Sequence, residues 1–180
     1  MKSGEVLYLA LSNWPAWMAA TMLGLQRQNG ASPTVEMQLY YSLVGRDVET
    51  EVVPLAAAER LGLLVWSPLA CGFLTGKYTF AERNPPGARP STFLQPPVDL
   101  ERGYDVVDVL HEIAQAHDFG PGHVAMAWLL AKPGVISMIF GISREEKLDD
   151  NLRAADLLLD AAKVARLDAA THHRSVILAG

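Results

Sequence analysis

The sequence predicts an α/β protein in which parallel strands alternate with helices. Three observations carry this prediction. Short apolar runs alternate along the chain with longer stretches of helical periodicity, which is typical of strand–helix units. Apolar residues make up 50% of the chain and charged residues 19%, which is enough for a buried core. The length of 180 residues, at roughly 150 residues per domain, predicts a single domain over residues 1–180.

Four strands are expected, each an apolar run of four to six residues. They lie at residues 6–11, 35–39, 63–66 and 135–140. The first run, VLYLAL, is apolar without interruption, which predicts a strand covered on both faces. Ser67 and Pro68 end the third strand, because proline cannot donate a hydrogen bond to a sheet ladder.

Helices are expected after the strands, and two of them stand between the third and the fourth strand. They lie at about residues 16–28, 48–60, 105–117, 124–131 and 161–170. Pro15 favours the start of the first helix, and Gly62 is expected to end the second. Residues 120–122 (Gly-Pro-Gly) are expected to separate the third from the fourth. Ser143 and Glu146 form a capping-box pattern, which predicts a further helix after the last strand.

Two segments lack a clear period. Residues 70–100 are rich in Gly, Pro and Arg, and a segment of this length without regular structure is usually a functional loop. Residues 171–180 form a tail without a pattern. A closed eight-stranded (β/α) barrel typically needs about 250 residues. The repetition therefore leaves two alternatives, half of such a barrel or a small doubly wound sheet.

Composition excludes several classes of protein. The net charge of −5, from 15 basic and 20 acidic residues, argues against a nucleic-acid partner. The single cysteine, Cys71, excludes an intrachain disulfide and a cysteine-rich zinc site, and it fits a reducing cytoplasm. The longest apolar stretch, residues 62–76, is too short and too interrupted to span a bilayer. The N-terminus is a poor signal peptide. We expect a cytoplasmic protein with no membrane partner.

The common nucleotide and hydrolase motifs are absent. The sequence contains neither G-x-G-x-x-G nor G-x-S-x-G. Residues 72–78 (GFLTGKY) superficially match a Walker A loop, but the glycines are too close and Tyr78 replaces the Ser or Thr. The histidines at 111, 117 and 123 recur every six residues and cannot share one helix face, so no metal site is expected from them or from the pair at 172–173.

The residues at the carboxyl ends of the four strands remain as candidates, because ligands of parallel sheets bind at that edge. Asn13 and Gln38 can each offer a donor and an acceptor to a carboxamide, and Trp66 can stack on a flat ring. A helix start after the fourth strand, with Arg144 and Lys147 nearby, suits an anion.

Each candidate also has a purely structural interpretation. Ser12, Asn13 and Ser143 are residue types that cap helices. Gln38 could satisfy a neighbouring loop, and Trp66 could belong to the core. Lys77 and Arg89 would then be solvated loop charges.

Five ordered stretches resemble the C-terminal half of the aldo-keto reductases, over about residues 2–170. LALSNW resembles the G-x-S-N stretch of the family, with Ala10 in the place of the usual glycine. VEMQLYYSLVGRDVETEVVP and WSPLACGFLTGKY resemble the next two segments, and WSPLACG is closest to the branch of potassium-channel β-subunits. VAMAWLLAKPGV and GISREEKLDDNL complete the series in the family's order.

This resemblance implies the last four strand–helix units of a (β/α)8 barrel and a site for NADP(H), the cofactor of the family's carbonyl reduction. Ser12, Asn13 and Gln38 would hold the nicotinamide carboxamide, and Trp66 would stack on the ring. The pyrophosphate would lie along Ser67, Leu69, Cys71 and Lys77. Arg89 would belong to the loop that closes over it. The adenosine and the 2′-phosphate would lie against Gly141, Ser143, Lys147, Asp150 and Asn151. Lys147 and Asp150 depart from the more usual Gln and Glu, which leaves NADP or NAD open.

The resemblance also implies that the catalytic groups are missing. The Asp, Tyr, Lys and His of the family come from its first four strands, and Met1 aligns just before the fifth. The tyrosines of this chain do not match the catalytic position; they are Tyr8, Tyr40, Tyr41, Tyr78 and Tyr104. The catalytic residues are therefore unknown, and a small carbonyl compound is the expected substrate class.

A half-barrel has two unpaired strand edges and a bare apolar interior, which are liabilities in solution. We therefore expect self-association, most simply as a two-fold homodimer. Three functions stay open: a reductase-like protein that keeps its dinucleotide site without the chemistry, a non-catalytic binding or regulatory module, or an enzyme of another class. The last would have a new site at the dimer seam, from groups such as Tyr41, Ser42, Asp108 or His111.

Overall fold

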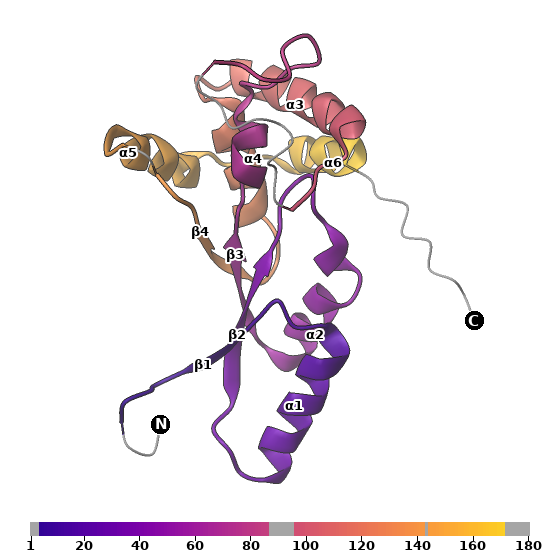
Figure 1. Ribbon diagram of the computed structural model, residues 1–180, viewed down its shortest axis with the longest axis vertical. Helices are drawn as coiled ribbons and strands as arrows, with labels where there is room; N and C mark the ends of the chain where they lie inside the picture. The colour runs from indigo at the N-terminus through magenta and orange to yellow at the C-terminus, as the bar shows by residue number, and fades with distance from the viewer. Residues whose placement is uncertain (1–3, 87–95, 143, 172–180) are drawn as a thin grey trace, which may run out of the picture.

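The computed structural model describes residues 4–86, 96–142 and 144–171. Within them, four strands form one sheet, and all neighbouring strands are parallel in the order β1-β2-β3-β4 (Figure 1). The strands are β1 (Leu9–Ser12), β2 (Thr34–Tyr40), β3 (Gly62–Trp66) and β4 (Val135–Ile139). The predicted α/β architecture with four parallel strand–helix units is therefore confirmed.

The α-helices of the described chain are α1 (Ala16–Gln28), α2 (Val52–Glu59), α3 (Leu100–Gln115), α4 (Pro121–Leu130), α5 (Glu146–Leu152) and α6 (Ala161–Ala170). Short 3-10 helices lie at Asp47–Glu49, Ala70–Thr75 and Arg153–Asp156. The bounds of α1 and α6 agree with the sequence prediction. Among the described residues, no helix is both long and apolar enough to cross a membrane.

The helix expected over residues 48–60 is shorter, and Gly62 does not end it. A 3-10 turn comes first, α2 ends at Glu59, and Arg60 takes the left-handed conformation (φ 57°) that the glycine was expected to supply. Gly62 is instead the first residue of β3. A Cβ there would lie 2.5 Å from Cδ1 of Ile136, so this glycine allows the close approach of β4.

The segment expected to lack structure is partly ordered. Ala70–Thr75 forms a 3-10 turn, and α3 begins at Leu100, where the Asp99 carboxylate accepts a hydrogen bond from the Arg102 N–H (3.4 Å). The Gly-Pro-Gly sequence separates α3 from α4 as expected, although Pro121 already belongs to the second helix as its first residue. The helix start expected at Ser143 falls on a residue outside the described ranges; α5 itself begins at Glu146, although the Arg144 carbonyl already accepts from the Lys147 N–H (3.1 Å).

The first strand is also shorter than predicted and is not covered on both faces. It begins at Leu9, and the three residues before it are exposed: Val6 (45%), Leu7 (73%) and Tyr8 (74%). Strand β1 lies at the edge of the sheet, with β2 as its one neighbour. Within the described residues, the apolar run therefore has no second strand to pair with.

Among the residues that the structure describes, one face of the sheet is packed. Met37, Leu39, Leu63 and Val65 alternate along β2 and β3 and are buried in the core beneath the helices. Helices α1 and α2 lie together along one side of the sheet (Figure 1). The residues between these core positions, such as Leu64, point to the other face and are only partly buried.

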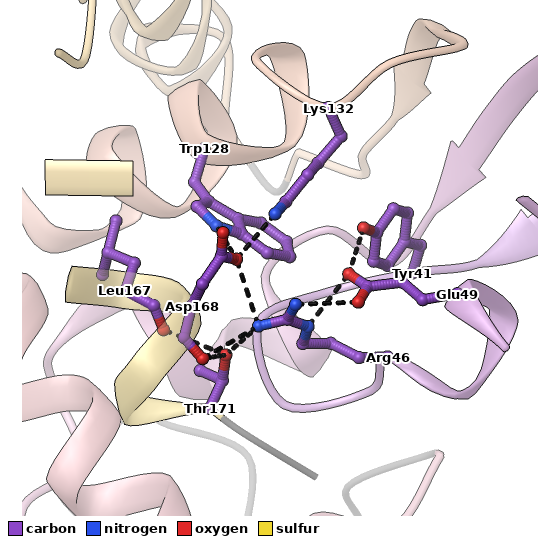
Figure 2. A network of polar contacts seen from close by, with 8 residues as sticks. All are labelled: Tyr41, Arg46, Glu49, Trp128, Lys132, Leu167, Asp168 and Thr171. Carbon is purple, nitrogen blue, oxygen red and sulfur yellow. Dashed lines mark hydrogen bonds and ion pairs between the residues drawn. The ribbon is translucent and has the colours of Figure 1, made fainter. Parts of the chain in front are cut away.

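A polar network joins three elements that are distant in sequence (Figure 2). The Arg46 guanidinium, after β2, donates to both carboxylate oxygens of Glu49 (2.9 and 2.7 Å) and lies 3.1 Å from the Asp168 carboxylate in α6. Asp168 also accepts from Lys132 Nζ (2.6 Å) and from Trp128 Nε1 (3.0 Å) at the end of α4. The network therefore fixes the loop after β2 against α4 and α6.

Tyr41 extends this network from the core side. Its hydroxyl donates to the Glu49 carboxylate (2.5 Å), and its ring packs edge-on against Trp128 at 5.5 Å between centroids. Burial, together with the hydrogen bond to Glu49, raises the pKa of Tyr41. The phenol therefore remains protonated and continues to donate.

We predict that Asp168→Ala lowers the free energy of unfolding by about 2 kcal/mol, because it leaves the Arg46 and Lys132 cations without their shared carboxylate. Urea denaturation measures the change. The matched control is Glu112→Ala, which removes an exposed ion pair with Arg166 and is expected to cost between about 0 and 1 kcal/mol. Equal losses in both variants would contradict a stabilising role for the network.

Candidate functional site

The carboxyl ends of β1, β2 and β3 are connected by a chain of side-chain hydrogen bonds. Trp66 Nε1 donates to Asn13 Oδ1 (3.0 Å), and Asn13 Nδ2 donates to Ser12 Oγ (3.2 Å). Ser12 Oγ in turn donates to Gln38 Oε1 (3.4 Å). Within the described residues, the Gln38 amide nitrogen has no partner of its own. These hydrogen bonds orient the Gln38 side chain and leave its amide N–H groups available to a ligand.

Ser12 and Asn13 are not helix caps. The residue before α1 is Pro15, and no side chain caps that helix. Asn13 has a left-handed backbone (φ 55°), and its N–H donates to the Gln38 carbonyl (2.9 Å), which continues the parallel ladder by one step. Asparagine tolerates this conformation better than most residues. Their interpretation as helix caps is therefore wrong.

Trp66 stands at the rim of the sheet rather than in its core. It pairs with Tyr40 across β2 and β3, and the two rings lie 5.2 Å apart at 38°. Its side chain is partly exposed. The indole therefore presents one surface that a flat ring could cover.

The loop after β3 has an unusual backbone. Ser67, Ala70, Cys71 and Gly72 all have positive φ, between 46° and 90°. For a residue other than glycine this costs about 1–2 kcal/mol, and such strain is often stored at functional sites. Ser67 Oγ accepts from the Cys71 N–H (3.3 Å), which holds the turn. A Cβ on Gly72 would lie 3.3 Å from the ammonium of Lys77, so the glycine leaves room for that cation.

A cavity of about 890 Å³ opens between this loop, the start of α4, the segment after β4 and α5. It brings together most of the residues expected to hold a dinucleotide. They are Trp66, Ser67, Leu69, Cys71, Lys77, Gly141, Lys147, Asp150 and Asn151. Ser12, Asn13 and Gln38 do not line it but reach it through Trp66. Arg89 and Ser143 lie outside the described residues.

The charges along this cavity favour an anion. Lys77, Arg144 and Lys147 line it together with one carboxylate, that of Asp150. The Asp150 carboxylate lies 3.6 Å from the Lys147 ammonium, so its charge is already partly neutralised. The remaining positive charge suits a phosphate group.

His123 is a residue of this site that the sequence did not indicate. Its Nδ1 accepts a hydrogen bond from the Gly120 N–H (2.9 Å), and its Nε2 lies 2.6 Å from the Asp150 carbonyl oxygen. The imidazole thus joins the start of α4 to α5. A histidine two places after Pro121, at the third position of the helix, was the available signal, because that position can bond back to the helix start. Among the described residues, no cluster of metal-ligating side chains is present.

Because Nδ1 of His123 accepts, the proton of the neutral ring must lie on Nε2, where it donates to Asp150. We predict that long-range nitrogen–proton NMR spectra near pH 8 show His123 as the Nε2–H tautomer. His123→Ala serves to assign the signal. Detection of the Nδ1–H tautomer would contradict the described arrangement.

The residues considered for a new active site at a dimer seam do not gather there. Tyr41 and Ser42 are buried, at 2% and 0% exposure, under the Arg46 network. His111 lies in α3, with Nε2 3.2 Å from the Gly76 carbonyl oxygen. Helix α3 packs mainly against α4 and α6, away from β1. The geometry therefore gives this alternative no support.

Comparison with known proteins agrees with the fold. Residues 1–172 match the aldo/keto reductase family. An uncharacterized oxidoreductase from Mycobacterium tuberculosis (strain H37Rv) is 39% identical over 80% of this chain and 44% of its own length. A probable voltage-gated potassium channel subunit beta from Arabidopsis thaliana is 34% identical over 86% of this chain and 48% of its own. An aryl-alcohol dehydrogenase from Pestalotiopsis microspora is 30% identical over 93% and 42%.

The chain spans less than half the length of these relatives. Its four parallel strands correspond to part of a (β/α) barrel domain. The sequence resemblance and the family match agree on the lineage. The chain belongs to the aldo/keto reductase family.

Proposed function

We propose that this chain binds NADP(H) at the carboxyl edge of its sheet and corresponds to strands five to eight of the family's barrel. The observation that carries the proposal is the continuity of two features. A cation-lined cavity of about 890 Å³ begins at Trp66, and the hydrogen-bonded edge formed by Ser12, Asn13 and Gln38 ends at the same residue. A nicotinamide dinucleotide needs both features, because it carries a flat ring with an amide group at one end and several phosphates beyond it.

The strand ends would hold the nicotinamide. The Gln38 N–H groups would donate to the carboxamide oxygen, and the second N–H of Asn13 is directed by its bond to Ser12. The partly exposed indole of Trp66 would stack on the ring. When bound, NADPH supplies a hydride from this ring to a carbonyl carbon. Ser12, through its bond to Gln38, would keep the amide in the required orientation.

The strained loop after β3 would hold the pyrophosphate. Its left-handed residues form a tight turn in which the N–H groups of Ala70, Cys71 and Gly72 bond within the loop, and the Lys77 ammonium lies beside Gly72. The Lys77 cation would bind the phosphates, with Ser67, Leu69 and Cys71 lining the same cavity. Arg89, which the resemblance assigns to this site, lies outside the described residues.

The adenosine end would lie between β4 and α5, against Gly141, Asn151 and the residues near them. Lys147, which lines the cavity, would recognise a 2′-phosphate, and Asp150, at 3.6 Å, reduces its charge in part. This arrangement favours NADP(H) over NAD(H), since only the former carries that phosphate.

We propose no catalytic residue in this chain. Two of the tyrosines bond within the fold: Tyr41 donates to Glu49, and the Tyr40 hydroxyl lies 2.9 Å from Ser42 Oγ. Burial raises the pKa of Tyr40, so its phenol stays protonated. The chain alone is therefore expected to bind the cofactor without reducing a small carbonyl substrate.

A second candidate function is regulatory binding without catalysis. Its support is the 34% identity to the potassium channel subunit of A. thaliana and the WSPLACG stretch. Both functions share the dinucleotide site. If cofactor binding changes the affinity for a protein partner and no turnover is seen, the result favours the regulatory function.

We predict that NADPH quenches the tryptophan fluorescence of the purified chain with saturation in the micromolar range. Trp66→Ala should abolish the quenching, whereas Trp17→Ala, which changes an exposed tryptophan in α1, should retain it. Lys147→Ala should weaken NADPH binding by about tenfold and leave NADH binding unchanged, since a charged hydrogen bond contributes about 1.4 kcal/mol or more. Absence of binding up to millimolar NADPH would contradict the proposal.

A further inference from the structure

A buried histidine joins two walls of the large cavity. His123, the third residue of α4, is 7% exposed. Its Nδ1 accepts from the Gly120 N–H (2.9 Å), and its Nε2 donates to the Asp150 carbonyl (2.6 Å). Gly120 and His123 line the cavity from the side of α4, and Asp150 lines it from α5. The imidazole therefore connects these two walls by hydrogen bonds to the backbone of each.

Both hydrogen bonds satisfy backbone groups that helix ends leave without partners. Gly120 precedes α4, and its N–H finds an acceptor in the imidazole. Asp150 lies in the last turn of α5, and the residue four places later, Ala154, is already outside that helix. A helix of only seven residues is marginal by itself, so α5 needs contacts of this kind with the rest of the fold.

The same imidazole lies beside the Asp150 side chain. Its Nε2 is 3.3 Å from Oδ1 of Asp150, and the other carboxylate oxygen, Oδ2, is 3.6 Å from the Lys147 ammonium. The ring thus holds the backbone of Asp150 and also stands against its carboxylate. Without the ring, the carboxylate would be free to turn fully toward Lys147 and neutralise the cation that a phosphate needs.

We propose that His123 is a positioning residue for the adenosine end of NADP(H). It fixes α5 against α4, and α5 contributes Lys147, Asp150 and Asn151 to the cavity. The inference rests on the proposed function, which assigns these three residues to that end of the cofactor. The nicotinamide end does not depend on His123, since Trp66 is held by a hydrogen bond that involves neither α4 nor α5.

Calorimetric titration with adenosine 2′,5′-bisphosphate tests the proposal, because this probe carries the adenosine end and its 2′-phosphate without the nicotinamide. We expect His123→Ala to weaken binding of the probe and of NADPH by about tenfold, as for the loss of a buried hydrogen bond. Quenching of the tryptophan fluorescence at saturating NADPH should keep its full amplitude, because the nicotinamide still reaches Trp66. A general folding defect would lower that amplitude as well.

Two further variants separate the hydrogen bonds of His123 from its volume. His123→Leu fills the space without hydrogen bonds and should lose as much affinity for the probe as His123→Ala. His123→Gln carries both an acceptor and a donor, and glutamine at the third helical position can bond back to the helix start. Its affinity should stay close to that of the unmodified chain. The matched control is His117→Ala, since the buried Nε2 of His117 has no hydrogen-bond partner within the described residues.

Hydrogen exchange in the unliganded protein gives a readout that needs no ligand. His123→Leu should speed exchange in α5 and leave β3 unchanged. Equal binding of the probe by His123→Leu and the unmodified chain would overturn this inference and leave the proposed function intact. So would a loss in His123→Gln as large as that in His123→Leu, or NADPH binding by an unmodified chain that does not bind the probe. Failure of the unmodified chain to bind NADPH would overturn both.

Discussion

A parallel sheet requires cover on both of its faces, because its strands bury apolar side chains on each side. In the described part of the chain the helices supply that cover on one face only. Met37, Leu39, Leu63 and Val65 are buried beneath them, whereas the opposite face of β2 and β3 stays partly exposed. The candidate site lies at the carboxyl ends of the same strands, where parallel sheets bind their ligands.

The candidate site lies where the strands end and the loops begin. Its order comes from the sheet, since parallel pairing brings Ser12, Gln38 and Trp66 to one edge. The loops then add the charges, with Lys77 after β3 and Lys147 in α5. The Arg46 network fixes the loop after β2 against α4 and α6, so the same strand that presents Gln38 is held at its carboxyl end.

The sequence predicted helix ends correctly where residues close in sequence determine them. Helix α1 begins after Pro15, as its sequence indicates. Strand pairing was predicted less well, because it depends on what lies beside the strand. The run over residues 6–8 has the composition of a strand but no second neighbour in the described chain. Gly62 was misinterpreted since its role is to approach Ile136, which is distant in sequence.

In the candidate site, too, local features could be predicted, whereas contacts between elements distant in sequence could not. Resemblance named Trp66, Ser67 and Lys77, and the cavity brings them together. It did not indicate His123, whose position depends on the meeting of α4 and α5 rather than on a motif. The hydrogen bonds from Trp66 to Gln38 were also beyond prediction, because the conformation of Asn13 (φ 55°) decides them. Residue types could be read from the sequence; contacts between distant elements could not.

We propose that the carboxyl edge of the sheet, and not the opposite edge, binds NADP(H). Hydrogen-exchange mass spectrometry with and without NADPH tests this proposal most directly. We expect slower exchange on binding in residues 12–13, 38–40, 66–77 and 144–151, with no change in residues 29–34 and 131–135 at the opposite edge. Protection confined to the opposite edge, or no protection at saturating NADPH, would contradict it.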